Sequence, residues 1–153
     1  MDKCGIRPMS PDDLEGVAAL EERSFSLPWT LGMLRESLAQ SATAVAYVLE
    51  DQDGIAAYLL ARQVLPEAEL LRIAVAADKR RKGYAGQLMR RWLSEAEEAG
   101  CRDFYLEIRQ SNEAAKALYA SFSFESAGIR KAYYADNGED AEIWSLHLEG
   151  NPL

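Results

Sequence analysis

The sequence predicts an α+β domain, in which a mixed and mostly antiparallel sheet of seven strands packs against four helices. The Asp53-Gly54 pair between two apolar runs is a typical hairpin signal, and Asn137-Gly138 marks a second turn near the end of the chain. Between them, residues 67–109 alternate a strand, a helix and a strand, which predicts a parallel pair with a right-handed crossover. The expected strands span residues 4–9, 44–50, 54–65, 70–76, 102–109, 124–134 and 140–148.

Helix starts are indicated by capping residues. Ser10-Pro11 combines a capping hydroxyl with proline at the first helical position, and the first helix is expected to end near Phe25. Thr30 is the expected cap of the second helix, and Ser111 that of the fourth.

The central stretch, residues 67–100, carries the clearest pattern. Residues 70–76 are almost continuously apolar, which is typical of a strand buried on both faces, and Arg72 is the one charge in this run. From Tyr84 the period becomes helical, and Gly100 ends the helix in the manner of a left-handed cap. The apolar residues of that helix are Leu88, Met89, Trp92, Leu93, Ala96 and Ala99.

The basic loop between this strand and helix predicts a phosphate site. The first turn of a helix has unpaired N–H groups and a partial positive charge, so an anion can bind there. Gly83, Ala85 and Gly86 would let a phosphate reach the backbone. The chain has a net charge of −8, yet four cations cluster here: Lys79, Arg80, Arg81 and Lys82. The loop lacks both the Walker and the dinucleotide-binding patterns, and on its own it could also be a solvated turn.

Composition sets further limits. A chain of 153 residues is long enough for one domain, 1–153, with its own core, and 48% hydrophobic with 27% charged residues is typical of soluble globular proteins. The sequence contains no apolar run of about 20 residues and no signal-peptide core, so we expect a cytoplasmic protein without a membrane partner. Cys4 and Cys101 lack metal-ligand spacing, which fits a reducing compartment. The acidic balance argues against direct nucleic-acid binding and suits a basic or amine substrate.

Several motifs resemble those of a known family. Arg80-x-x-Gly83-x-Ala85 resembles the Q/R-x-x-G-x-G/A signature with which GNAT acetyltransferases bind the pyrophosphate of acetyl-CoA. Further segments, in order and spacing along essentially the whole chain, resemble the RimI-type N-terminal acetyltransferases of that superfamily. They are Pro28-Trp29, Ile73-Ala74-Val75, Leu106-Glu107-Ile108-Arg109, Ser111-Asn112-Glu113-Ala114-Ala115, Leu118-Tyr119, Arg130-Lys131-x-Tyr133-Tyr134 and Asp140-Ala141.

Two positions depart from the family pattern. Ala85 replaces a loop glycine, which the pattern allows, and Ser123 stands where the family usually has glycine. A non-glycine residue at position 123 would cost about 1 kcal/mol if the backbone there is left-handed.

The resemblance implies a GNAT fold with splayed central strands, acetyl-CoA as cosubstrate and no metal. It implies acetyl transfer, by direct attack in a ternary complex, to a protein N-terminus, in particular the N-terminal alanine of a small-subunit ribosomal protein. We expect a monomer or weak dimer. Acetylation of lysine side chains or small amines is an alternative, and so is a CoA-binding domain without turnover, although Glu107 and Tyr119 together argue against the latter.

The resemblance also assigns roles to residues. Glu107 is the expected base; the alternatives are that it only pairs with Arg109, or that Glu69 is the base. Tyr119 is the expected acid for the leaving thiolate, although its helical pattern alone favours core packing. Asn112 is expected to contact the pantetheine arm. The oxyanion is expected to bind a backbone N–H of Ile73, Ala74 or Val75, and the pyrophosphate the backbone of Arg81, Lys82, Gly83, Tyr84, Ala85 and Gly86.

The substrate peptide is expected between two aromatic loops. One carries Trp29, for which core packing is the alternative, and the other carries Tyr133 and Tyr134. His147, the only histidine, is expected to be structural, and Cys101 to be an ordinary thiol, so a Cys-His nucleophile is not favoured.

Overall fold

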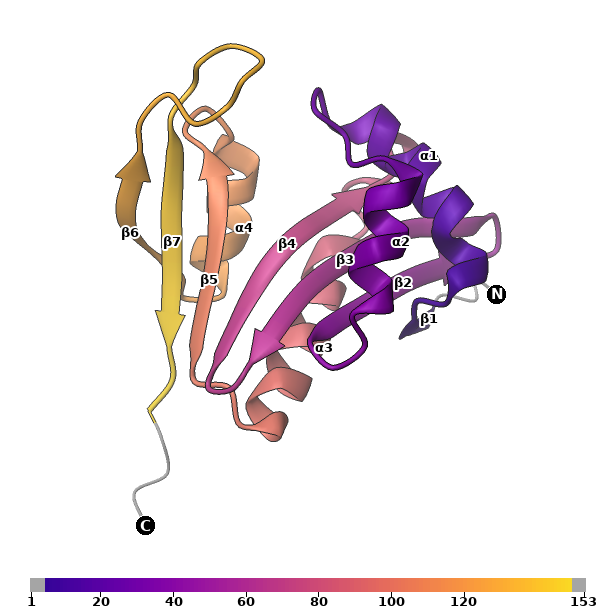
Figure 1. The fold of residues 1–153 in the computed structure, drawn as a ribbon, viewed down its shortest axis with the longest axis horizontal. Helices are drawn as coiled ribbons and strands as arrows, with labels where there is room; N and C mark the ends of the chain where they lie inside the picture. Colours follow the sequence, from indigo (N-terminus) through magenta and orange to yellow (C-terminus); the bar gives the residue numbers. More distant parts are fainter. Residues whose placement is uncertain (1–4, 150–153) are drawn as a thin grey trace.

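A computed structural model describes residues 5–149 and contains one seven-stranded sheet in the order β1-β2-β3-β4-β5-β7-β6 (Figure 1). Every neighbouring pair is antiparallel except β4 and β5, which are parallel. The predicted α+β class, with a mixed and mostly antiparallel sheet, is confirmed. The strands are β1 (Gly5–Pro8), β2 (Ala44–Asp51), β3 (Gly54–Val64), β4 (Glu67–Val75), β5 (Asp103–Arg109), β6 (Glu125–Arg130) and β7 (Ala141–His147).

Helices cover both faces of the sheet. On one face lie α1 (Leu14–Ser24) and α2 (Leu31–Ala39), and on the other lie α3 (Tyr84–Ala99) and α4 (Glu113–Ser121) (Figure 1). Each face has its own hydrophobic core. The core under α3 and α4 is the larger and includes Leu88, Met89, Trp92, Phe104, Leu106 and Ile108, whereas that under α1 and α2 includes Val17, Leu20, Leu34, Val48 and Tyr58. Among the described helices, none is long and apolar enough to cross a membrane.

The predicted helix ends are mostly confirmed. Thr30 caps α2 by accepting a hydrogen bond from the Met33 amide at 3.2 Å, and Gly100 ends α3 with a left-handed φ of 112°. Ser10 precedes a short 3-10 turn, η1 (Pro11–Asp13), that leads into α1. The prediction that Ser111 caps the fourth helix is wrong.

Asn112 is the cap of α4. Its Oδ1 accepts a hydrogen bond from the Ala115 amide at 3.0 Å, because an asparagine one residue further along reaches the same first turn. At the other end of α4, Ser123 has a φ of 72°, so it occupies the left-handed conformation in which glycine is the relaxed residue.

The central strands separate as the family resemblance implies. β4 and β5 pair only along Glu67–Glu69 and Asp103–Tyr105, and then diverge (Figure 1). Just beyond the last β4–β5 pair, β4 contains one residue more than its other neighbour, β3. Leu60 pairs with Arg72 and Ala61 with Leu70, so Leu71 between them has no partner on β3. Such a bulge bends its strand and increases the local twist. The bulge at Leu71 therefore lies where β4 leaves β5 and the sheet opens.

Candidate active site

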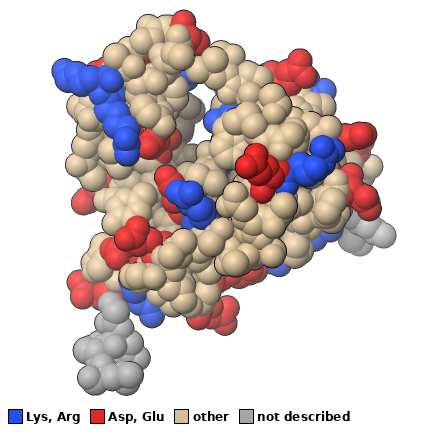
Figure 2. All heavy atoms as spheres, in the orientation of Figure 1, with Lys and Arg blue, Asp and Glu red and all other residues tan. Residues whose placement is uncertain are grey.

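A cavity of about 640 Å³ occupies the split between β4 and β5. Its two long walls are formed by residues 70–75 of β4 and residues 106–109 of β5. Figure 2 shows an opening at the surface between the half of the molecule that contains β5, β7 and β6 and the half that contains α1 and α2. The end of α1 borders the cavity from one face of the sheet, while the start of α3 and one side of α4 border it from the other. The cavity thus passes through the sheet, and two reactants could meet in it from opposite faces.

Backbone amides of β4 point into this split. The Ala76 amide donates to the Ala56 carbonyl of β3 at 2.8 Å. Since backbone groups alternate in direction along a strand, Ala74 also faces β3, whereas Ile73 and Val75 face the gap left by β5. Of the three residues predicted to offer an oxyanion donor, the strand geometry therefore favours Ile73 and Val75.

The basic loop has the geometry of an anion site. Gly83, the residue before α3, has a φ of 80°, and Arg81 has a φ of 66°. No described side chain caps α3, so the amides of Ala85 and Gly86 in its first turn are open to a ligand. Arg80 and Ala85 also line the cavity, which places the loop at its α3 end.

Lys79 does not contribute to this site as the sequence suggested. Its Nζ lies 3.0 Å from Asp51 and also pairs with Asp53, so two carboxylates already neutralise its charge. For Arg80, Arg81 and Lys82 the described structure contains no ion pair with a carboxylate. Three of the four cations, rather than all four, are therefore not neutralised by a carboxylate of the described chain.

Glu107 lies on the α1/α2 side of β5, with its side chain about one quarter exposed. It borders both the main cavity and a neighbouring groove of about 560 Å³. Its Oε1 lies 3.3 Å from the Arg130 guanidinium, and a hydrogen bond from the Tyr133 hydroxyl raises the pKa of that tyrosine. A carboxylate in this position can accept a proton from a group that enters the split.

The suggested ion pair of Glu107 with Arg109 is not present. Arg109 instead binds Asp136 at 2.7 Å and Ser26 at 3.2 Å, and its guanidinium lies 4.0 Å from the ring centroid of Tyr134. These contacts join the loop after α1 to the loop between β6 and β7 at one end of the cavity.

Glu69, the alternative base, lies in the part of the sheet where β4 and β5 are paired. It faces Tyr105 where β4 and β5 are still paired, and its carboxylate binds Arg62 at 2.7 Å. It borders the neighbouring groove but not the main cavity. The geometry therefore favours Glu107 for contact with an amine inside the split.

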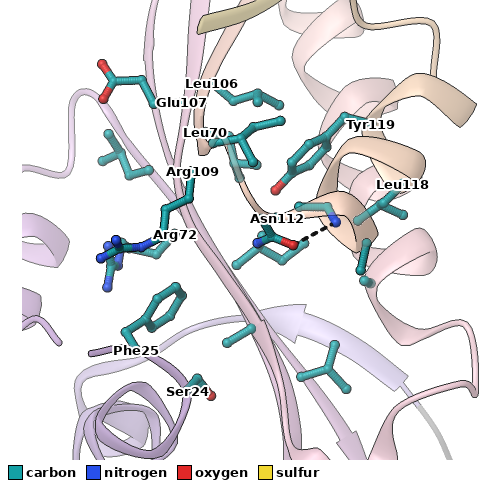
Figure 3. Close-up of a pocket in the computed structure, with 18 of the residues that line it drawn as sticks. Ser24, Phe25, Leu70, Arg72, Leu106, Glu107, Arg109, Asn112, Leu118 and Tyr119 are labelled. Carbon is teal, nitrogen blue, oxygen red and sulfur yellow. Dashed lines mark hydrogen bonds between the residues drawn. The ribbon is translucent and has the colours of Figure 1, made fainter. Parts of the chain in front are cut away.

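Tyr119 approaches the cavity from the opposite face. It is only 6% exposed, and its ring packs against Phe124 with centroids 6.1 Å apart, so the expected core packing is present. Its hydroxyl nevertheless points toward the split (Figure 3). Burial raises the pKa of this hydroxyl well above the usual 10, so that it keeps its proton at physiological pH. Tyr119 therefore presents a protonated hydroxyl to the cavity.

The remaining predicted contacts fall into two groups. Asn112 and Tyr134 border the cavity; because the Oδ1 of Asn112 caps α4, its NH₂ is the group left for a ligand. Tyr133 lies at the surface, 49% exposed, beside Glu107. Trp29 does not border the cavity: it packs against the α1/α2 core and lines a smaller, separate pocket.

Sequence reasoning missed part of the cavity wall. Phe25, Leu27 and Arg72 border the cavity, and Figure 3 shows Phe25 and Arg72 together on one side of it. Arg72 could have been identified from the sequence, because it is the one charge in an apolar strand. Phe25 lies in the irregular segment after α1, where periodicity does not predict which way a side chain points. Cys101 and His147 lie outside the cavity, and His147 binds Asp103 at 2.6 Å.

Comparison with known proteins agrees with this geometry. The pattern of the acetyltransferase (GNAT) family matches residues 14–124. A putative [ribosomal protein bS18]-alanine N-acetyltransferase of Bacillus subtilis is 34% identical over 141 residues, covering 92% of this chain and 93% of that protein. The [ribosomal protein bS18]-alanine N-acetyltransferase of Escherichia coli is 34% identical over 145 residues, covering 94% and 97%.

Solved structures give the same result for the fold. The crystal structure of the ribosomal-protein-S18-alanine N-acetyltransferase from E. coli superposes with a TM-score of 0.91 at 32% identity, over 98% of this chain and 97% of that one. Arabidopsis thaliana NAA60 in complex with acetyl-CoA, at 18% identity, shares the fold with a TM-score of 0.87 over 97% of this chain and 100% of that one. With its split sheet, its loop before α3 and these matches along most of its length, the chain belongs to the GNAT family of acetyltransferases.

Proposed function

We propose that this protein transfers the acetyl group of acetyl-CoA to the N-terminal α-amine of a protein, and that its substrate is the N-terminal alanine of a small-subunit ribosomal protein. The observation that carries the proposal is the cavity through the sheet, which has Glu107 on one side and the Tyr119 hydroxyl on the other. The names of the B. subtilis and E. coli relatives support the choice of substrate. A ribosomal substrate would place the reaction in the cytoplasm, and we propose a monomer or weak dimer.

Acetyl-CoA would enter from the α3/α4 face. Its pyrophosphate would bind the amides of residues 81–86 and the cations beside them, as an anion binds a helix N-terminus. The NH₂ of Asn112 would donate a hydrogen bond to the pantetheine arm. The thioester carbonyl would then lie in the split, where the amides of Ile73 and Val75 point. One such donor typically contributes about 10²–10³ in rate.

The peptide would enter from the α1/α2 face, between the Phe25–Leu27 segment and Tyr134. A free α-amine has a pKa of about 8, so Glu107, directly or through a water, is a sufficient base at neutral pH. The neutral amine attacks the thioester carbonyl, the new C–N bond forms, the attacking nitrogen releases its second proton to water, and the C–S bond breaks. Tyr119 donates its proton to the leaving thiolate and recovers one as the products leave.

Mass spectrometry can test this function with two synthetic peptides. The first begins with a free alanine and contains one lysine, and the second differs only in a blocked α-amine. We expect the enzyme with acetyl-CoA to add one acetyl group to the first peptide, at its N-terminus, and to leave the second almost unchanged. Equal rates on both peptides would instead identify a lysine or general amine acetyltransferase, and no product on either would contradict the proposed function.

A further inference from the structure

A buried carboxylate outside the reacting groups connects the central strand to the substrate side of the cavity. Glu21 on α1 is 0% exposed, and its two oxygens accept hydrogen bonds from three separate segments. Oε1 accepts from the Tyr58 hydroxyl of β3 and from Arg72 Nε of β4, at 3.3 Å for the latter. Oε2 accepts from Arg72 Nη2 and, at 2.8 Å, from the Trp29 amide in the loop between α1 and α2.

Arg72 continues this connection toward the cavity. Its guanidinium lies 3.9 Å from the ring centroid of Phe25 and 5.3 Å from that of Trp29, so it contacts both aromatic rings of the loop. Arg72 and Phe25 both border the cavity (Figure 3), and the next residue along β4 is Ile73, whose amide points into the split. The loop that faces an incoming peptide is thereby attached to the strand that faces the acetyl group.

This arrangement is not explained by stability alone. Desolvating two charges costs several kcal/mol per ion, and apolar residues of similar volume often stabilise a core as well or better. The Glu21 carboxylate instead fixes the orientation of the groups around it. The segment after α1 is irregular backbone, and the Glu21 oxygens fix one of its amides, while Arg72 fixes the ring of Phe25.

We propose that Glu21 is a positioning residue, which acts through Arg72 and the Trp29 amide to hold Phe25 as the wall against which the first residue of the substrate peptide binds. The inference rests on the proposed function, because it requires a peptide N-terminus as the substrate. Glu21 does not touch the substrate and takes no part in proton transfer. Its loss should therefore affect peptide binding and selection far more than the chemical step.

Glu21→Gln tests this role with almost no change in volume. An amide has one acceptor and one donor group, so either the Trp29 amide or Arg72 loses its acceptor. We expect the KM for an alanine peptide to rise about tenfold, while kcat stays within about twofold and the Kd of acetyl-CoA measured by calorimetry is unchanged. The preference for alanine over a larger first residue, measured as a ratio of kcat/KM, should fall as Phe25 moves more freely.

Tyr58→Phe is the matched control. It removes a hydrogen bond from the same carboxylate, on the side that faces the core, and leaves Trp29 and Arg72 in place. If Glu21 acted only through core stability, both variants would lower the melting temperature and change the KM in parallel. We expect Tyr58→Phe to lower the melting temperature without changing the peptide KM or the preference for alanine.

Arg72→Lys covers the case in which Glu21→Gln does not fold. Lysine keeps a positive charge beside Glu21 but loses the planar group that stacks on Phe25. We expect the same rise in peptide KM and the same loss of preference for alanine, again with unchanged binding of acetyl-CoA. An unchanged peptide KM in the folded variants would overturn the positioning role. Failure of the wild-type enzyme to acetylate the peptide would overturn the proposed function instead.

Discussion

Replacing Glu107 by glutamine is the sharpest test of the catalytic assignment. Glu107 lies two residues beyond Tyr105, the partner of Glu69, which places the two carboxylates about 7 Å apart along the strand direction. Glu107 lies where β4 and β5 have separated, whereas Glu69 lies where they are still paired and binds Arg62. Of the two carboxylates, only Glu107 borders the cavity in which, under the proposed mechanism, the amine loses its proton.

The expected loss can be estimated from the proton that must be removed. A general base contributes about 10²–10⁴ in rate, which corresponds to about 3–5 kcal/mol of activation free energy. An amine with a pKa of about 8 is already about one-tenth neutral at pH 7, so the loss should be near the lower limit. We expect Glu107→Gln to lower kcat about 10²-fold at pH 7. The deficit should shrink as the pH approaches about 9, because more of the amine is then neutral without a base.

The assay follows release of the CoA thiol over a range of pH, with Glu69→Gln as the matched variant. Loss of Glu69 should mainly raise the peptide KM, as expected for a residue that contributes only to binding. Thermal melts of both variants exclude unfolding as the cause. An inactive Glu69→Gln with an active Glu107→Gln would assign the base to β4. A Glu107→Gln profile parallel to that of the wild type would show that Glu107 accepts no proton.

Three further outcomes are expected. Tyr119→Phe keeps the ring against Phe124, so the melting temperature should change little while kcat falls about 10²-fold. Because burial raises the pKa of Tyr119, ionisation of this residue should cause no loss of wild-type activity up to about pH 10. Gly83→Val should abolish acetyl-CoA binding in calorimetry, whereas Gly54→Val, at another left-handed glycine with open space around it, should cost similar stability and leave binding intact. Lys82→Ala should raise the KM for acetyl-CoA several-fold. Lys79→Ala should raise this KM much less, because Lys79 is already paired with Asp51 and Asp53. Equal effects of the two variants would contradict the assigned pairing.

Periodicity and turn residues predicted the elements well because their signals are local. Residues 44–65 form the predicted hairpin, which turns at Gln52 and Asp53, directly before Gly54. The helix that ends before Gly100 buries Leu88, Met89, Trp92 and Ala96 of its apolar face, whereas Leu93 is half-buried and Ala99 is exposed. The cap of α4 was misplaced by one residue, since Ser111 and Asn112 are both good caps and only the backbone decides between them. Local rules cannot resolve such a choice.

The walls of the cavity depend on long-range contacts, and these were harder to predict. Trp29 was expected near the substrate because it lies in a loop between helices, yet its ring packs beside Arg72 while Phe25 from the same loop borders the cavity. Glu21 fits the helical period of α1, and the sequence did not indicate that its carboxylate would bind the backbone of that loop. Its partners lie 8, 37 and 51 residues away, so their meeting depends on the assembled sheet.

The alternation of side chains along β5 explains how the proposed acid and base, twelve residues apart, can reach one molecule. Leu106 and Ile108 point to the α3/α4 core, which fixes Glu107 on the other face, while Tyr119 comes from the helix that covers that core. In a closed sheet these two side chains would be separated by a layer of paired backbone. The bulge in β4 and the early end of the β4–β5 pairing remove that layer, and the same separation turns the amides of Ile73 and Val75 toward the gap. The opening between the strands thus accounts for the candidate site more directly than any single side chain, because the proposed base, acid and oxyanion donors share one space only where the sheet is incomplete.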